Sequence, residues 1–66
     1  MTELSLGDEV EVTTGTINDG EPFAATVLSV DESTFTATVE PHSLDVVEMA
    51  VVGKGEITET INTNRN

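Results

Sequence analysis

Hydrophobic and polar residues alternate along much of this chain, most clearly between Pro22 and Pro41. In residues 34–40, phenylalanine, alanine and valine take every second position, with threonine and glutamate between them. A period of two is typical of a strand with one face on the core and the other in water. Residues 23–30 carry apolar groups on both faces, which favours a strand in the middle of a sheet. The pattern therefore predicts two consecutive strands joined by a short polar turn at 31–33.

The segment before this pair contains one further strand and a loop. After Gly7, Val10 and Val12 alternate with glutamate and threonine, as expected for a strand with one dry face. Residues 14–21 then predict a loop, in which Ile17 points inward. Its turn lies at Asn18-Asp19-Gly20, because these residue types tolerate positive φ.

The segment after the pair is open to two interpretations. Residues 44–52 contain several β-branched valines, which favour a strand. Ser43 is also a residue type that begins helices, so one helical turn near 43–46 is the alternative. Gly53-Lys54-Gly55 predicts a tight hairpin loop, and Ile57 and Ile61 mark a last strand.

Five short strands separated by turn signals predict an all-β fold, a small five-stranded antiparallel barrel. Closure of a barrel removes the sheet edges that would otherwise pair with other chains. We expect a single domain over residues 1–61 and a frayed polar tail at 62–66. The predicted core consists of Val10, Val12, Ile17, Phe23, Val27, Leu28, Val30, Phe35, Ala37, Val39, Val47, Met49, Val51 and Ile57.

Two segments resemble the sequence motifs of Sm-like proteins. Residues 20–31 (GEPFAATVLSVD) resemble the first motif, which runs from a turn glycine through a bent strand to an aspartate. Residues 51–57 (VVGKGEI) resemble the second, a pair of apolar stretches around a glycine turn. The resemblance implies a small SH3-like barrel. It does not carry over the RNA contacts, because the family's bend glycine, RNA-binding asparagine and arginine are replaced by Ala25, Phe35 and Val52.

Negative charge dominates the composition. Thirteen aspartate and glutamate residues face one lysine and one arginine, a formal net charge of −11. The acidic residues are spread through every segment, which indicates a uniformly solvated surface rather than a binding arm. Eleven threonines stand where most soluble proteins place lysine. The composition resembles that of haloarchaeal proteins, which work in a salt-rich cytoplasm; the alternative is an acidic protein whose charge serves solubility.

Several function classes find no support in the residues. The chain has no cysteine and one histidine, His42, so we predict no catalytic residue, no metal site and no cofactor. Two basic residues supply little of the counterion release on which binding to nucleic acid depends, which argues against that partner. No apolar run is long enough to span a membrane, and the stretch after Met1 lacks the basic and apolar regions of a signal peptide. The expectation is a cytoplasmic protein without a membrane partner.

The remaining feature is an apolar stretch in the second half of the chain. A domain this small buries only about 60% of the surface that its unfolded chain exposes, so association with another chain would stabilise it. The candidate interaction residues are Val46, Val47, Met49, Val51 and Val52. We expect a non-enzymatic module that binds another protein or a copy of itself. An RNA-associated Sm-like or SH3-like module is the alternative.

Overall fold

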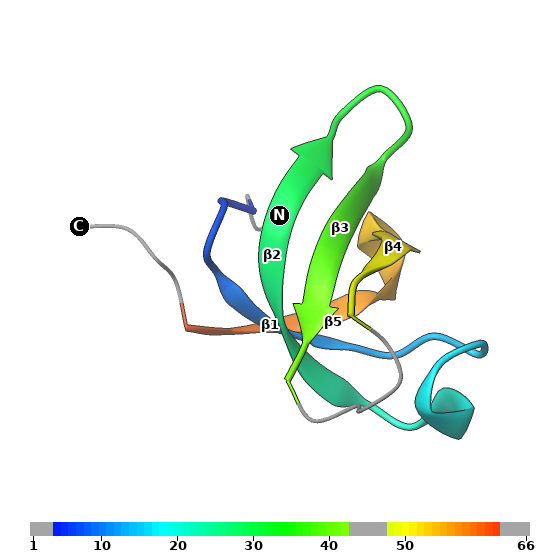
Figure 1. The fold of residues 1–66 in the computed structure, drawn as a ribbon. Coiled ribbons are helices and arrows are strands. Elements are labelled where there is room, and N and C mark those ends of the chain that lie inside the picture. The colour runs from blue at the N-terminus through cyan, green and yellow to red at the C-terminus, as the bar shows by residue number, and fades with distance from the viewer. Residues whose placement is uncertain (1–3, 43–47, 63–66) are drawn as a thin grey trace.

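The alternating segments form the strands of one antiparallel sheet (Figure 1). The computed structural model describes residues 4–42 and 48–62. The strands are β1 (Glu9–Val12), β2 (Phe23–Asp31), β3 (Thr36–Pro41), β4 (Ala50–Gly53) and β5 (Ile57–Asn62). Two single 3₁₀ turns, η1 (Asn18–Gly20) and η2 (Lys54–Glu56), complete the elements. The described residues contain no α-helix, so the all-β prediction is confirmed.

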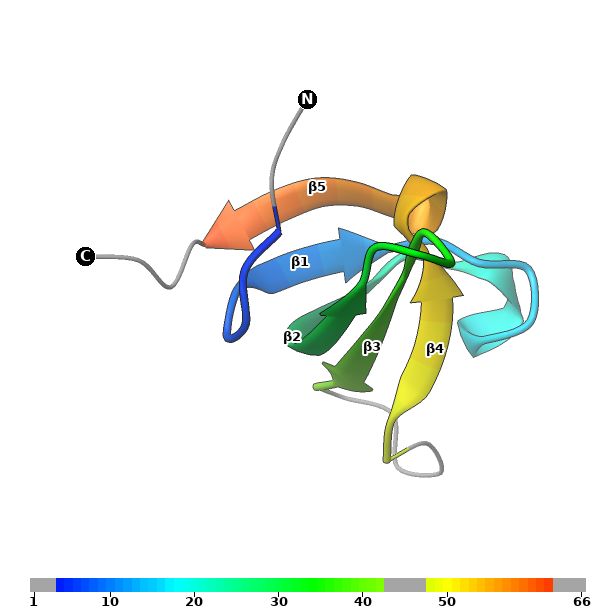
Figure 2. The same cartoon turned by 90° about the horizontal axis from the view of Figure 1, so that it is seen from above.

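The strand order is β4-β3-β2-β1-β5, which places β2 in the middle, as its two apolar faces predicted. β4 and β5 lie at opposite edges, and over the described ranges the sheet does not close on itself. Seen from above, the sheet is strongly curved, and η2 lies where β4 ends and β5 begins (Figure 2). The hairpin predicted at residues 53–55 is therefore wrong, because η2 carries the chain from one edge to the other. A hydrogen bond from Thr13 N to the carbonyl of Glu56 (2.9 Å) ties η2 to the end of β1.

The core consists chiefly of valine and alanine side chains, with one phenylalanine. Its buried members are Val10, Val12, Phe23, Ala25, Val27, Ala37, Val39 and Val52. Ile17, Val30 and Ile57 pack around it and are partly buried, which agrees with the prediction. Four predicted core residues are instead exposed: Leu28, Phe35, Met49 and Val51. A fifth, Val47, lies outside the described residues.

A break in the pairing of β2 with β3 explains the position of Leu28. The register shifts between Val27 and Ser29, so Leu28 is the extra residue of a bulge. The shift returns Val30 to the core face, where it pairs with Ala37. The sequence pattern had placed Val30 on the face opposite Val27, and a period of two does not reveal a bulge.

The turn between β2 and β3 explains the position of Phe35. The strand predicted from residue 34 begins at Thr36, and the turn covers residues 32–35. Phe35 has a φ of 56°, so the backbone there is left-handed and its side chain leaves the alternation that the strand follows. The loop turn at Asn18-Asp19-Gly20 is confirmed, with all three residues at positive φ.

The entry to β1 is tied directly to β2. Gly7 N donates to the carbonyl of Val27, and Val27 N donates to the carbonyl of Asp8, each at 2.8 Å. Gly7 has a φ of 88°, a conformation that favours glycine. The Asp8 side chain is fully buried and accepts a hydrogen bond from Ser5 N (2.9 Å). The sequence pattern had treated Asp8 as one more surface acid.

Two further predictions concern residues at the limits of the described ranges. The tail is predicted to begin at Asn62, but Asn62 is the last residue of β5; residues 63–66 lie outside the described residues. The alternative helical turn at 43–46 also lies outside the described residues. Within 4–42 and 48–62, no helix has the length and apolar character needed to cross a membrane.

Candidate functional site

The open edge of the sheet at β4 is the candidate site. Among the described residues β4 pairs only with β3, with Ala50 opposite Val39 and Gly53 opposite Thr36. The next residue, Lys54, donates its backbone N–H to the carbonyl of Phe35 at 3.0 Å. In an antiparallel pair, hydrogen-bonded and non-hydrogen-bonded positions alternate. Ala50 and Val52 therefore bond to β3 as Lys54 does, while the N–H and C=O groups of Val51 and Gly53 point away from β3.

The side chains along β4 follow the same alternation. Val52 is 3% exposed and belongs to the core, whereas Val51 is 69% exposed; Met49, directly before the strand, is 62% exposed. These two are the most exposed large hydrophobic side chains in the described part of the chain. Of the five candidate interaction residues, the structure thus brings Met49 and Val51 together on the solvent face and places Val52 beneath them. Val46 and Val47 lie outside the described residues.

Glu56 covers one end of this edge. Its Oε1 accepts a hydrogen bond from the backbone N–H of Gly53 at 3.0 Å. The outward N–H of Gly53 is thereby occupied, so the part of β4 that remains open centres on Val51. No role for Glu56 was predicted from the sequence. Glu56 lies three residues after Gly53. At this spacing in a capping box, a glutamate side chain reaches back to the backbone N–H, so the spacing was the sequence signal for this contact.

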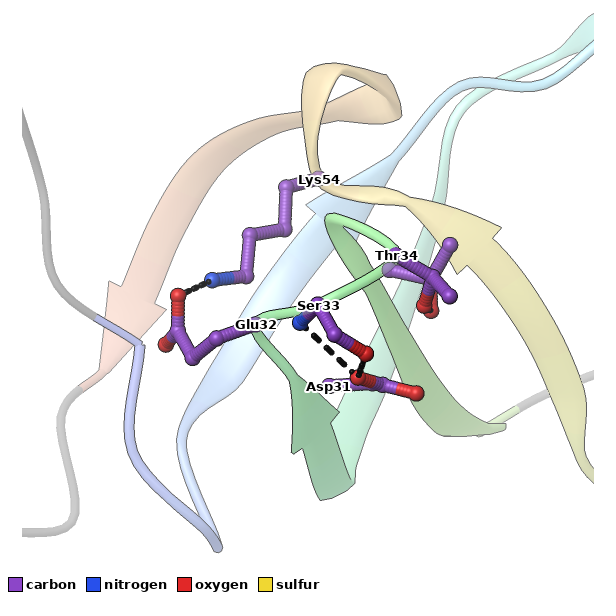
Figure 3. A network of polar contacts seen from close by, with 6 residues as sticks. Asp31, Glu32, Ser33, Thr34 and Lys54 are labelled. Carbon is purple, nitrogen blue, oxygen red and sulfur yellow. Dashed lines mark hydrogen bonds and ion pairs between the residues drawn. The ribbon is translucent and has the colours of Figure 1, made fainter.

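A group of polar contacts holds η2, at the end of β4, against the turn between β2 and β3 (Figure 3). Lys54 Nζ lies 2.7 Å from Glu32 Oε1 and 5.4 Å from the centre of the Phe35 ring. Cations over aromatic rings are attracted by the negative ring face. The Lys54 side chain is 14% exposed, although Glu32 is almost fully in solvent. The one lysine of the sequence is therefore engaged within the domain.

The turn itself is organised by Asp31. Asp31 Oδ1 accepts hydrogen bonds from the Ser33 hydroxyl (2.7 Å) and from Ser33 N (3.0 Å), as Figure 3 shows. The hydrogen bonds from the Ser33 hydroxyl and backbone, with a further one from the Thr34 hydroxyl, hold the pKa of Asp31 below its ordinary value of 3.8. The carboxylate therefore stays charged while it shapes the turn that presents Phe35.

Two other kinds of site can be checked in the structure: a metal site and a site at His42. Among residues 4–42 and 48–62, no group of three or more histidine, cysteine, aspartate or glutamate side chains is arranged to hold a metal ion. His42 lies beside Thr26, with 2.5 Å between its Nε2 and the threonine hydroxyl oxygen. Its backbone N–H donates to the carbonyl of Ala24, so it continues the pairing of β2 with β3.

Comparisons with known proteins add no relative. No protein-family profile, no curated protein and no solved structure matches the chain.

Proposed function

We propose that this protein is a non-enzymatic interaction domain that binds an extended segment of another protein along the open edge of β4. One observation carries the proposal: the outward backbone groups of Val51 coincide with the exposed side chains of Met49 and Val51. An edge strand is a template for a further strand. In such strand addition, main-chain hydrogen bonds supply affinity and alternate side chains supply specificity.

The other edge of the sheet is less suited to this role. β5 carries one exposed large hydrophobic residue, Ile61 at 53%, whereas β4 carries Val51 at 69% with Met49, at 62%, directly before the strand. Exposed Thr58 and Glu59 lie in the same strand. Thr58 donates its hydroxyl to the Glu11 carboxylate on β1. Charged and polar side chains of this kind protect an edge strand from pairing, so the proposal favours β4.

The proposal includes a finer description of the fold. The curved five-stranded sheet, with η2 joining its two edges, supports a small SH3-like barrel that is open between β4 and β5. The resemblance to Sm-like motifs in residues 20–31 and 51–57 supports the same architecture. The dispersed carboxylates support a salt-rich cytoplasm as its working environment.

One observation favours a second candidate function, that of an RNA-associated module. Phe35, the last residue of the β2–β3 turn, is 54% exposed, and an exposed aromatic ring is a platform on which a base can stack. The adjacent Lys54 is already paired with Glu32, and a formal charge of −11 repels phosphate at low salt. Binding of a protein segment is therefore the function that we favour.

Co-purification in high salt from cells that naturally contain the protein tests the proposal. Three tagged forms are compared: the wild type, Val51→Thr at the β4 edge, and Ile61→Thr as a matched control at the β5 edge. We expect the wild type and Ile61→Thr to retain the same protein partner and Val51→Thr to lose it. Circular dichroism of each form confirms that the fold is intact. Equal retention by all three forms, or retention of RNA in place of protein, would overturn the proposal.

A further inference from the structure

We infer that the segment bound at β4 is apolar at its centre and carries lysine or arginine at both ends. This inference rests on the proposed function and specifies the partner's chemistry. It follows from the juxtaposition of the open, apolar stretch at Met49 and Val51 with a carboxylate at each end, Glu48 and Glu56.

The two carboxylates bracket the open edge. Glu48 is exposed and directly precedes Met49, while Glu56 reaches back to the outward N–H of Gly53. β4 has four residues, so at about 3.3 Å per residue it spans roughly 13 Å, and Glu48 and Met49 extend the stretch before its start. An extended segment of six or seven residues covers that length. Basic residues at its two ends then lie beside the two carboxylates.

No free cation of the described residues neutralises this region. Lys54 follows β4 directly, but its ammonium group is paired with Glu32 and lies over the Phe35 ring. Charge complementarity therefore favours a basic partner. A second copy of this chain brings the same carboxylates and a further formal charge of −11, so at low salt it is repelled from the same edge.

The centre of the segment is set by Met49 and Val51. Val51 lies within β4, Met49 directly precedes the strand, and both side chains are exposed. A bound strand would exchange hydrogen bonds with Val51 and pack small apolar side chains, at alternate positions, against Met49 and Val51. Apolar side chains at every second position of the partner follow from this arrangement.

Titration of the ¹⁵N-labelled protein with synthetic heptapeptides tests the inference by nuclear magnetic resonance. The probe alternates valine with threonine and has lysine at both ends. Matched peptides have serine or glutamate at the ends, and a fourth has an N-methyl group on a central amide. The titrations use the lowest salt concentration at which the protein spectrum remains dispersed, so that every measurement is made on folded protein.

We expect resonances of β4 to shift, with affinity falling from lysine to serine to glutamate ends, and the N-methylated peptide to bind least. Glu48→Gln and Glu56→Gln should each weaken binding of the lysine-ended peptide by up to about fivefold, the range of an exposed ion pair. The Glu56→Gln substitution keeps a side-chain oxygen for Gly53 N, so the edge retains its geometry. The matched control Glu59→Gln removes a charge from β5 and should leave the affinity unchanged. Near 1 M salt, where the Debye length is about 3 Å, the advantage of lysine ends should fall to the part that directly contacting ion pairs retain.

The outcomes separate the two proposals. If the serine-ended peptide binds β4 as tightly as the lysine-ended one, the basic partner is wrong and the β4 interaction site stands. If no peptide shifts the β4 resonances, the interaction site and the basic partner are both wrong. If Glu59→Gln weakens binding as much as Glu48→Gln does, the lysines respond to the overall charge and the bracketing arrangement is rejected.

Discussion

Lys54 makes three contacts that join segments far apart in the sequence. Its backbone N–H donates to the Phe35 carbonyl, its ammonium group pairs with Glu32, and the same group lies over the Phe35 ring. Together they hold η2, and with it the end of β4, against the β2–β3 turn. In a chain with thirteen acidic residues, the single lysine is placed where it fixes the candidate site.

Replacing Lys54 by methionine should destabilise the domain modestly. The substitution keeps most of the buried stem and removes the charge, so the ion pair and the ring contact are both lost. Exposed ion pairs and cation–ring contacts each contribute up to about 1 kcal/mol, so we expect a loss of about 1 kcal/mol in the free energy of unfolding. Chemical denaturation measures it. Glu32→Gln is the control, since it removes only the ion pair; a loss as large as that of Lys54→Met would show that the ring contact adds nothing.

Asp31 gives the turn a defined pH dependence. Its pKa is lowered below 3.8 in the folded state, chiefly by the Ser33 hydroxyl and the Ser33 N–H. A group with a lowered folded pKa contributes stability above its unfolded pKa, and that contribution disappears as the pH falls through the folded value. Ser33→Ala removes the first of these hydrogen bonds and should raise the pKa of Asp31 towards 3.8. A carboxyl titration followed by nuclear magnetic resonance measures the change, and an unaltered pKa would contradict the hydrogen bond's role.

At the scale of elements, β4 is short, paired on one side and partly capped. Proteins protect such edges with charges and short strands. Here the Glu56 side chain occupies the outward N–H of Gly53 and leaves Val51 open. The capped half has no free N–H for another strand, and the open half is where we propose that a partner binds.

Glu56→Ala should therefore increase self-association. The substitution frees the N–H of Gly53 and lengthens the open edge, and sedimentation in molar salt detects the larger species. Glu56→Gln is the matched control, because it removes the same charge and keeps an acceptor for Gly53. Association of Glu56→Gln to the same extent would assign the effect to lost charge and contradict a role for the cap.

Local patterns predicted the strands, and two elements show where such patterns fail. The alternation of Val10 and Val12, and of Ala37 and Val39, predicted buried faces correctly because a pleated strand with one dry face requires it. The bulge at Leu28 and the left-handed turn at Phe35 lie in local backbone geometry that hydropathy does not record. Both residues were placed in the core and are exposed.

The candidate site could be predicted only in part, because a local hydropathy pattern does not record how strands pair. The valine-rich stretch indicated a surface, and Met49 and Val51 are exposed there. Which valine faces inward depends on the register of β4 with β3, a contact between residues distant in sequence. The route from β4 through η2 to the far edge is likewise a property of the assembled sheet. In the sequence, Gly53 and Gly55 are as compatible with a tight hairpin as with the 3₁₀ turn η2 that the structure shows.

At the scale of the whole molecule, the size of the domain decides how far its charges repel one another at a given salt concentration. The domain has a radius of gyration of 10.8 Å, close to the roughly 11 Å expected for a compact chain of this length. At 0.01 M salt the Debye length is about 30 Å, which exceeds the radius of gyration, so all carboxylates repel one another. Near 1 M it is about 3 Å, and only neighbouring charges interact.

The midpoint of thermal unfolding should therefore rise clearly between about 0.01 M and about 1 M salt. Screening lowers the repulsion of the compact state more than that of the extended unfolded chain, in which the charges are farther apart. Mild acidification should act in the same direction at first, because it removes negative charge. Calorimetry or circular dichroism measures the midpoint, and a value that stays flat over this range would contradict adaptation to a salt-rich environment.

Amide hydrogen exchange in the free protein tests the open edge of β4 most directly. Val51 and Val52 are neighbours in one strand, and alternation directs the N–H of Val52 to β3 and that of Val51 away from the sheet. We predict that the Val51 amide exchanges at least about tenfold faster than the Val52 amide, because only the latter is held by a hydrogen bond within the sheet. Equal protection of the two amides would mean that the edge is already covered, and would contradict its assignment as a binding site.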